Sequence, residues 1–353
     1  MTVPMIVDVD TGIDDSLALL YLLASEDAEI LGIASTAGNV PVNQVAANNL
    51  AWLDLCRAGD VEVSLGAQVP LVAPLMTTED THGPQGIGYA ELPVSTRSLS
   101  DRDATTMWVE LVRSRPGEIT GLVTGPLTNL ALAIRRDPEL PRLLKRLVLM
   151  GGAFQHQGNT TPTTEWNIAV DPEAAAEVFA AFSGLPPERH PIVCALDITE
   201  TIEMTPDHIK RLAGRARSLP PEVISPDDAP GVRSTASNPI VRHFSDAVRF
   251  YMEFHRDHDQ GFLAHSHARN DSGRLARDVG QGPQCRDRHA HRSRGILRPL
   301  DRTGRSTRRP ALPRGIGGRR RFRNRRRRVA PERPTRRSAN RLAPGPRRRR
   351  VSP

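Results

Sequence analysis

Four aspartates are concentrated near the N-terminus, in the stretch "IVDVDTGIDDSLALLYLL" at residues 6–23. The apolar residues on both sides predict a buried strand followed by a helix, so that Asp10, Asp14 and Asp15 lie in the connecting turn. Unpaired carboxylates at one point repel each other, and some of them would hold protons. A divalent cation removes this conflict, and carboxylate oxygens are hard ligands that favour Ca²⁺ or Mg²⁺. The sequence therefore predicts a metal site in this turn.

Three other interpretations compete for the same aspartates. A helix N-cap with acidic first-turn residues explains Asp14 or Asp15 alone, but not the string that begins at Asp8. An EF-hand loop fails because its fifth position, counted from Asp8, is Gly12. A phosphatase of the haloacid dehalogenase type, with the pattern D-x-D-x-T/V, would use Asp8 as nucleophile and Mg²⁺ as cofactor. Its fifth position is again Gly12, but this alternative stays open as another reaction class.

The first 265 residues alternate between strand-like and helix-like patterns. The strand-like runs cover residues 3–9, 29–38, 61–66, 118–125, 146–152 and 191–199. The helical patterns cover residues 16–25, 42–56, 104–114, 127–136, 172–183 and 206–217. This alternation predicts an α/β fold with an open, mostly parallel sheet and helices on both faces. Ligands of such sheets bind beyond the carboxyl ends of the strands, where this sequence places Asp, Asn, Thr, Gly and Met.

Composition divides the 353 residues into two regions. Residues 1–265 carry 19 Lys and Arg against 35 Asp and Glu, a net charge of −16, whereas residues 266–353 carry 29 against 5, a net charge of +24. The second region is rich in Arg, Pro and Gly, contains no Lys and lacks sustained apolar periodicity, so it is predicted to be a disordered tail. One interpretation is an arm that binds nucleic acid non-specifically through its arginines. The other is the product of a frameshift in a GC-rich gene.

The remaining composition favours a cytoplasmic protein. The three cysteines, Cys56, Cys194 and Cys285, are far apart and form no CxxC motif, which is typical of a reducing compartment. No basic segment followed by an apolar run marks a signal peptide, and no apolar stretch is long enough to predict a membrane span.

The aspartate motif and five later segments resemble the inosine-uridine-preferring nucleoside hydrolases. "DVDTGIDD" differs from that family's D-x-D-P-G-x-D-D only by Thr11 in place of Pro. The other segments follow in the family's order over residues 3 to about 265. They are "STAGNV" at 35–40, "THGPQGIG" at 81–88, "TGPLTNLALA" at 124–133, "LVLMGGAF" to "GNTTPTTEWNIAVDPEAA" at 147–175, and "ALDIT" at 195–199.

The resemblance implies hydrolysis of the N-glycosidic bond of a ribonucleoside, with Ca²⁺ as cofactor. Asp10, Asp15 and the main-chain oxygen of Thr124 would hold the ion, and Asp10 would act as general base toward water. Residues implied to bind the substrate are Asp14, Asn39, His82, Met150, Asn159, Glu165 and Asn167. Taken singly, several of these could be caps, surface charges or core residues. Family members are commonly homodimers or homotetramers.

The resemblance stops where the Arg-rich region begins. The family usually presents a His-Asp pair that protonates the leaving base and completes the metal shell. Here His265 would be the acid, but Ser266 stands where the aspartate is expected. This coincidence favours the frameshift over an added nucleic-acid arm. It predicts weaker Ca²⁺ binding and impaired activity, and it keeps open a catalytically inactive protein that only binds nucleosides or nucleic acid.

Overall fold

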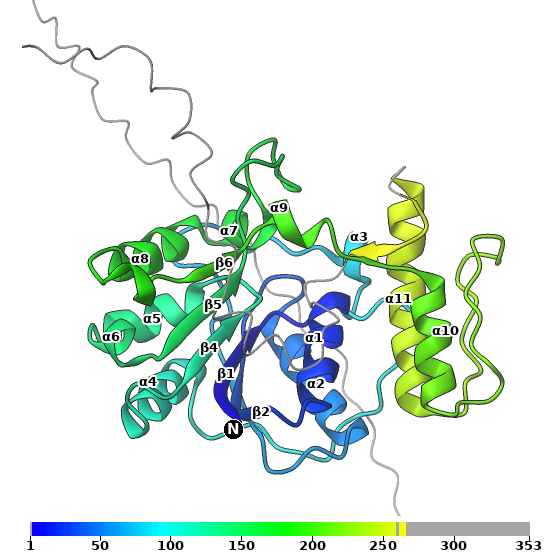
Figure 1. The fold of residues 1–353 in the computed structure, drawn as a ribbon, viewed down its shortest axis with the longest axis horizontal. Coiled ribbons are helices and arrows are strands. Elements are labelled where there is room, and N and C mark those ends of the chain that lie inside the picture. The colour runs from blue at the N-terminus through cyan, green and yellow to red at the C-terminus, as the bar shows by residue number, and fades with distance from the viewer. Residues whose placement is uncertain (1, 259–260, 266–353) are drawn as a thin grey trace, which may run out of the picture. The chain divides into compact units, whose positions relative to one another are not determined.

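A parallel six-stranded sheet forms the centre of the molecule (Figure 1), as seen in a computed structural model that describes residues 2–258 and 261–265. Its strands are β1 (Val3–Val9), β2 (Ala28–Ser35), β3 (Glu62–Leu65), β4 (Thr120–Val123), β5 (Arg146–Met150) and β6 (Ile192–Cys194). They follow the order β3-β2-β1-β4-β5-β6, and every pairing is parallel. The predicted α/β class and parallel sheet are therefore confirmed. The predicted disorder of residues 266–353 lies outside the described residues.

Helices connect the strands and extend beyond the sheet. They are α1 (Ile13–Leu23), α2 (Val42–Leu55), α3 (Glu79–His82), α4 (Ala104–Ser114), α5 (Thr128–Arg136), α6 (Leu140–Leu143), α7 (Trp166–Val170), α8 (Pro172–Ser183), α9 (Leu196–Thr199), α10 (Pro206–Arg215) and α11 (Pro239–Asp257). A short 3₁₀ turn spans Pro187–Arg189, and the two-residue strands β7 (Glu203–Met204) and β8 (Ala264–His265) pair antiparallel.

The alternation of side chains along β1 explains why helices cover both faces of the sheet. Met5, Val7 and Val9 pack with residues of α1 and α2 on one face. Ile6 packs with residues of α4, α5 and α8 on the other. Because successive strand residues point to opposite faces, a strand this apolar must be buried on both sides. Asp8 comes two residues after Ile6 and therefore points to the same face, toward α4 and α5.

The short elements α3, α6, α7, β7 and β8 were not predicted, and two longer segments also differ from the sequence prediction. The run 191–199 was predicted as one strand, but β6 ends at Cys194 and α9 begins at Leu196. There the Leu196 amide leaves the ladder to bond the Gly152 carbonyl, and the Thr199 amide bonds the Ala195 carbonyl. The long helix α11 was not predicted at all.

Helix α11 begins at a capped N-terminus. The Asn238 side chain accepts bonds from the amides of Ile240 and Val241. Pro239 occupies the first helical position, where a backbone N–H would have no partner within the helix, so its absence costs no hydrogen bond. None of the helices among the described residues is long and apolar enough to cross a membrane.

The order of the strands predicts where a ligand would bind. Connections run outward in opposite directions from β1 and β4, so the crevice of the sheet opens beyond the carboxyl ends of these two neighbours. Asp10 follows β1 and Thr124 follows β4 directly. The strands run upward in Figure 1, so this crevice lies at the upper edge of the sheet.

Candidate active site

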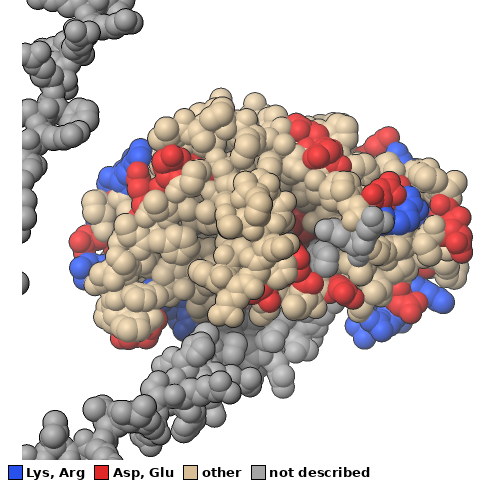
Figure 2. All heavy atoms as spheres, turned by 90° about the horizontal axis from the view of Figure 1, so that it is seen from above, with Lys and Arg blue, Asp and Glu red and all other residues tan. Residues whose placement is uncertain are grey.

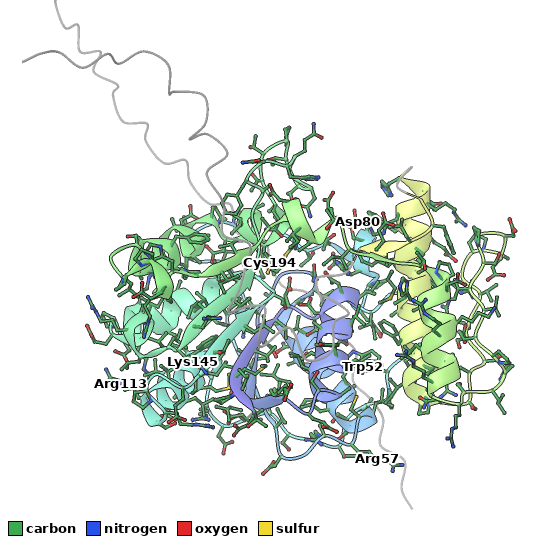
Figure 3. The ribbon with its side chains drawn as sticks, viewed as in Figure 1. Trp52, Arg57, Asp80, Arg113, Lys145 and Cys194 are labelled. Carbon is green, nitrogen blue, oxygen red and sulfur yellow. The ribbon has the colours of Figure 1, made fainter. Side chains whose placement is uncertain are left out.

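A cavity of about 510 Å³ lies beyond these strand ends. It is lined by every predicted site residue except His265: Asp10, Asp14, Asp15, Asn39, His82, Thr124, Met150, Asn159, Glu165 and Asn167. Seen from above, the middle of this face carries acidic side chains, whereas the basic ones lie toward its ends (Figure 2). Arg57, Arg113 and Lys145 lie toward the opposite, lower edge (Figure 3).

Asp10 is the most tightly enclosed of the lining carboxylates. Its side chain is fully buried, and its Oδ2 accepts a 2.9 Å bond from the Asn39 amide. No hydrogen-bond donor of the described residues reaches its Oδ1. Burial raises the pKa of Asp10 well above its usual range, and the neighbouring Asp15 and Asp14 carboxylates raise it further. A Cβ at Gly38 would lie 2.2 Å from Asp10 Oδ2, so this packing requires glycine.

Asp15 and Thr124 are held by bonds that join the first turn of α1 to the end of β4. The Thr124 hydroxyl donates to Asp15 Oδ1, and the Gly12 amide donates to Oδ2 at 2.9 Å. The Asn39 side chain approaches the same Oδ2 at 3.3 Å. The main-chain oxygen of Thr124 accepts a 2.7 Å bond from Asn167 Nδ2, which leaves one of its two lone pairs for another partner.

These groups fit a hard cation by chemistry. They supply only oxygen donors, Asp10 Oδ1 is buried without a hydrogen-bond donor in the described part of the chain, and the Asp15 and Asp14 carboxylates add to the rise in the pKa of Asp10. Residues 2–258 and 261–265 contain no group of three or more His, Cys, Asp or Glu side chains arranged to hold a metal ion.

His82 closes the side of the cavity next to Asp14. Only 5% of the residue is exposed, and its Nδ1 accepts a 3.2 Å bond from the Ile13 amide. The same nitrogen lies 3.9 Å from Asp14 Oδ1, too far for a hydrogen bond. Because Nδ1 accepts from an amide, the neutral ring carries its proton on Nε2.

The opposite wall follows β5. The Glu165 carboxylate is buried and caps α7, because it accepts bonds from the amides of Asn167 and Ile168, and it also accepts one from Gly152. The interpretation of Glu165 as a surface charge is therefore wrong. Asn167 Nδ2 contacts both the oxygen and the sulfur of Met150, at 3.2 and 3.3 Å. Asn159 lies exposed on the loop that precedes α7.

A third wall was missed by the sequence prediction and consists mainly of rings. Tyr251, Phe254 and His255 of α11, and His258 directly after it, line the cavity. The Tyr251 ring lies 5.3 Å from that of His82 and 4.4 Å from that of His255, between centroids. Burial raises the pKa of Tyr251 well above its usual range, as do the Asp14, Asp15 and Glu200 carboxylates. The spacing of three and four residues between these side chains was the available sign that they share one face of a helix. The same spacing is equally typical of a helix that faces the core.

Two further lining residues carry polar atoms without a partner. The Thr199 hydroxyl and the Trp166 indole nitrogen are buried, and within the described residues neither has a hydrogen-bond partner. Thr199 is 2% exposed. Buried polar groups are almost always bonded, so these two are available to a bound molecule.

The side chain of Asp8, in β1, points to the face of the sheet covered by α4 and α5 and does not line the cavity. Its buried carboxylate accepts bonds from Thr36 Oγ1, Trp108 Nε1 at 2.8 Å and Asn129 Nδ2 at 3.0 Å. Burial raises its pKa to about 6 against the effect of these donors. A carboxylate enclosed in this way cannot reach a phosphate ester in the cavity, so the geometry speaks against Asp8 as the nucleophile of a phosphatase.

His265 is placed only by its backbone. It pairs with Glu203 across β7 and β8, and its side chain lies outside the described part of the structure. Its predicted role as an acid therefore stays a prediction.

Comparison with known proteins identifies the family. The model of the inosine-uridine preferring nucleoside hydrolases matches residues 5–276, which extends beyond residue 265. The pyrimidine-specific ribonucleoside hydrolase RihA of Salmonella enteritidis is 34% identical over 263 residues, covering 74% of this chain and 76% of that protein.

Solved structures agree with this match. A plant nucleoside hydrolase superimposes with a TM-score of 0.64 at 28% identity, covering 75% of this chain and 76% of the other. A purine-preferring ribonucleoside hydrolase from Gardnerella vaginalis gives 0.63 at 29%, covering 74% and 77%. With its parallel sheet, its acidic cavity and these relatives, the chain belongs to the family of inosine-uridine preferring nucleoside hydrolases.

Proposed function

We propose that this protein hydrolyses the N-glycosidic bond of ribonucleosides, giving ribose and a free base. The observation that carries the proposal is the convergence of the separately predicted residues on one cavity. Relatives named as ribonucleoside hydrolases support the same reaction. One of them is named pyrimidine-specific and another purine-preferring, so the proposal covers both classes of base.

Developing positive charge is what this cavity can stabilise. Cleavage of a glycosidic bond passes through an oxocarbenium-like sugar cation. The buried carboxylates of Asp10, Asp14 and Asp15 surround the site with negative charge in a low-dielectric environment, where it acts strongly. Asp10 is the proposed general base, because its Oδ1 has no donor among the described residues and can take a proton from the attacking water.

The family depends on a metal ion, and we propose that the ion is Ca²⁺. Asp10, Asp15 and the Thr124 oxygen would hold it. When bound, such an ion makes a water easier to deprotonate and orients neighbouring hydroxyls. Asp14, Asn39, Asn159, Glu165 and Asn167 would then hold the ribose, with Met150 beneath the sugar and His82 beside the base.

The leaving base needs a proton, and His265 is the proposed donor. Ser266 follows it where the family has a metal-binding aspartate, so we expect weak Ca²⁺ binding and slow turnover. The test is release of base from uridine and inosine by the full chain with Ca²⁺ and with a chelator. We expect chelator-sensitive release below the range typical of enzymes, which is about 1 to 1,000 per second.

A substitution that restores the expected carboxylate sharpens this test. Ser266→Asp should tighten Ca²⁺ binding and raise turnover, whereas Ser293→Asp adds the same charge elsewhere and should do neither. Turnover in the typical range by the unaltered chain would show that the missing carboxylate does not matter. No release by any of these proteins would leave a nucleoside-binding protein as the better account.

The basic C-terminal region supports a second candidate function. Its net charge of +24 suits non-specific binding of nucleic acid, which weakens steeply with salt. Retention of the full chain on DNA, lost at high salt, would support this candidate. A cytoplasmic location and assembly into a homodimer or homotetramer are further proposals from the family resemblance.

A further inference from the structure

Side chains of helix α2 form hydrogen bonds with the turn that carries the aspartates. Thr11, between Asp10 and Gly12, is fully buried and donates its hydroxyl to Asn49 Oδ1 at 2.5 Å. Asn49 Nδ2 in turn donates to the Ser35 hydroxyl at the end of β2, at 3.1 Å. This bonded chain ties the turn to a helix and to a neighbouring strand.

Two more α2 side chains bond the same turn. Asn48 Nδ2 donates to the Gln85 carbonyl at 2.8 Å and approaches the Thr11 carbonyl at 3.4 Å. Trp52 Nε1 donates to the Ser16 hydroxyl at 2.9 Å, and that hydroxyl donates to the Gly12 carbonyl at 2.7 Å. The turn is therefore bonded at Thr11, Gly12 and Ser16.

These bonds oppose the repulsion between the carboxylates. Asp10 precedes Thr11, and the amide of Gly12, which follows it, donates to Asp15 Oδ2. Movement of Thr11 would therefore shift both proposed metal ligands. The resembled family has Pro at this position, whose ring fixes the backbone directly. Thr has no such ring, but its hydroxyl bonds the Asn49 side chain.

We propose that Thr11 is a positioning residue that fixes Asp10 and Asp15 through Asn49. Its effect on metal binding rests on the proposed function, but its effect on the turn does not. Removal of a group that orients metal ligands typically weakens metal affinity about 10- to 100-fold. Thr11→Val keeps the shape of the side chain and removes the hydroxyl, whereas Thr11→Ser keeps the hydroxyl.

The experiment uses two readouts on the full chain. Calorimetric titration with CaCl₂ measures metal affinity, and hydrogen exchange of the peptide over residues 10–16 measures the turn without metal. Thr11→Val should lower Ca²⁺ affinity about 10- to 100-fold and speed exchange of this peptide. Thr11→Ser should resemble the unaltered protein in both. Val112→Ala, a buried substitution in α4, controls for general loss of stability.

The outcomes separate the two proposals. Equal exchange in Thr11→Val and the unaltered chain would overturn the role of Thr11, as would an equal change in Val112→Ala. If the unaltered chain binds no Ca²⁺, the proposed metal fails and hydrogen exchange still decides the role of Thr11. If Thr11→Val does not fold, Asn49→Leu replaces it and should show the same two changes. If both single variants fold, losses that do not add in the double variant support the bond.

Discussion

The cavity has two halves that are built differently. The sheet-edge half, made by Asp10, Asp15, Asn39, Thr124 and Asn167, follows strand ends and is joined by hydrogen bonds. The helix half, made by Thr199, Tyr251, Phe254, His255 and His258, is joined mainly by ring contacts, and the Thr199 hydroxyl has no partner in the described structure.

Under the proposed function, this difference suits the two parts of a nucleoside. Directional bonds hold carboxylates in one arrangement, which an invariant ribose and a metal ion require. Ring contacts are less directional and accept flat molecules of different size. Relatives are named both for pyrimidine and for purine substrates.

Loss of the proposed general base should produce the largest fall in kcat, and the substitution changes only the sheet-edge half. Asp10→Asn keeps the size of the side chain but cannot accept the proton of water, so kcat should fall about 10²- to 10⁴-fold. Steady-state release of base measures it. Glu177→Gln removes a surface ion pair with Arg135 and is the control. A fall of kcat equal to that of the control would exclude Asp10 as the base.

Displacement of the Asp10 carboxylate should lower kcat less than its removal. Gly38→Ala puts a methyl group 2.2 Å from Asp10 Oδ2, and displacement of a catalytic group by an ångström can lower the rate about 10²-fold. Gly214→Ala in α10 is the matched control, because its Cβ meets nothing within 4 Å. The control should gain about 0.5–1 kcal/mol of unfolding free energy from helix propensity. Equal kcat in both variants would contradict the tight packing around Asp10.

A substitution in the helix half should raise KM without lowering the free energy of unfolding. Thr199→Val removes a hydroxyl without a partner in the described residues, so the free energy of unfolding should stay equal or rise. One lost hydrogen bond to substrate should raise KM about 2- to 10-fold. Thr201→Val, whose hydroxyl donates to the Ile198 carbonyl on the exposed side, should leave KM unchanged. An unchanged KM in Thr199→Val would remove that residue from substrate binding.

The smallest effect should come from a substitution outside both halves, and it should be a change in stability that depends on pH. Donors from Ser95, Thr96 and Arg97 lower the pKa of Asp54 to about 2. A carboxyl whose pKa is depressed by folding stabilises the protein above its unfolded pKa, and this contribution disappears as pH falls from about 4 to about 2. Urea midpoints of the unaltered chain and Asp54→Asn should therefore converge over this range. A constant difference would contradict the role of the Asp54 charge.

Most of the sheet-edge half could be predicted from sequence because Asp10, Asn39 and Thr124 stand just beyond apolar strands, whereas Asn167 of α7 was implied only by the family resemblance. β1 was predicted with its observed bounds, and the turn at Asp10 followed from them. Parallel strands bring such ends together whatever the intervening helices do. The capping role of Glu165 could not be predicted, because it depends on which amides the turn before α7 exposes.

The helix half could not be predicted because periodicity does not reveal what a helix faces. Tyr251, Phe254 and His255 share spacing with the core residues Phe244 and Val248 of the same helix. Only the packing of α11 against α1 and α3 decides which end of the helix meets a cavity. Likewise, "ALDIT" reads as a buried strand until the Gly152 carbonyl draws Leu196 out of the ladder.

The order in which the cavity is assembled has a consequence for synthesis of the protein. Its lining begins at Asp10 and ends at His258, so most of the body must leave the ribosome before the site can close. Contacts between such distant residues form slowly, and chains grow from the N-terminus. A nascent chain would thus expose its unneutralised aspartates throughout translation. A nucleoside can therefore stabilise the finished protein, but the complete cavity forms only after the last lining residues have left the ribosome.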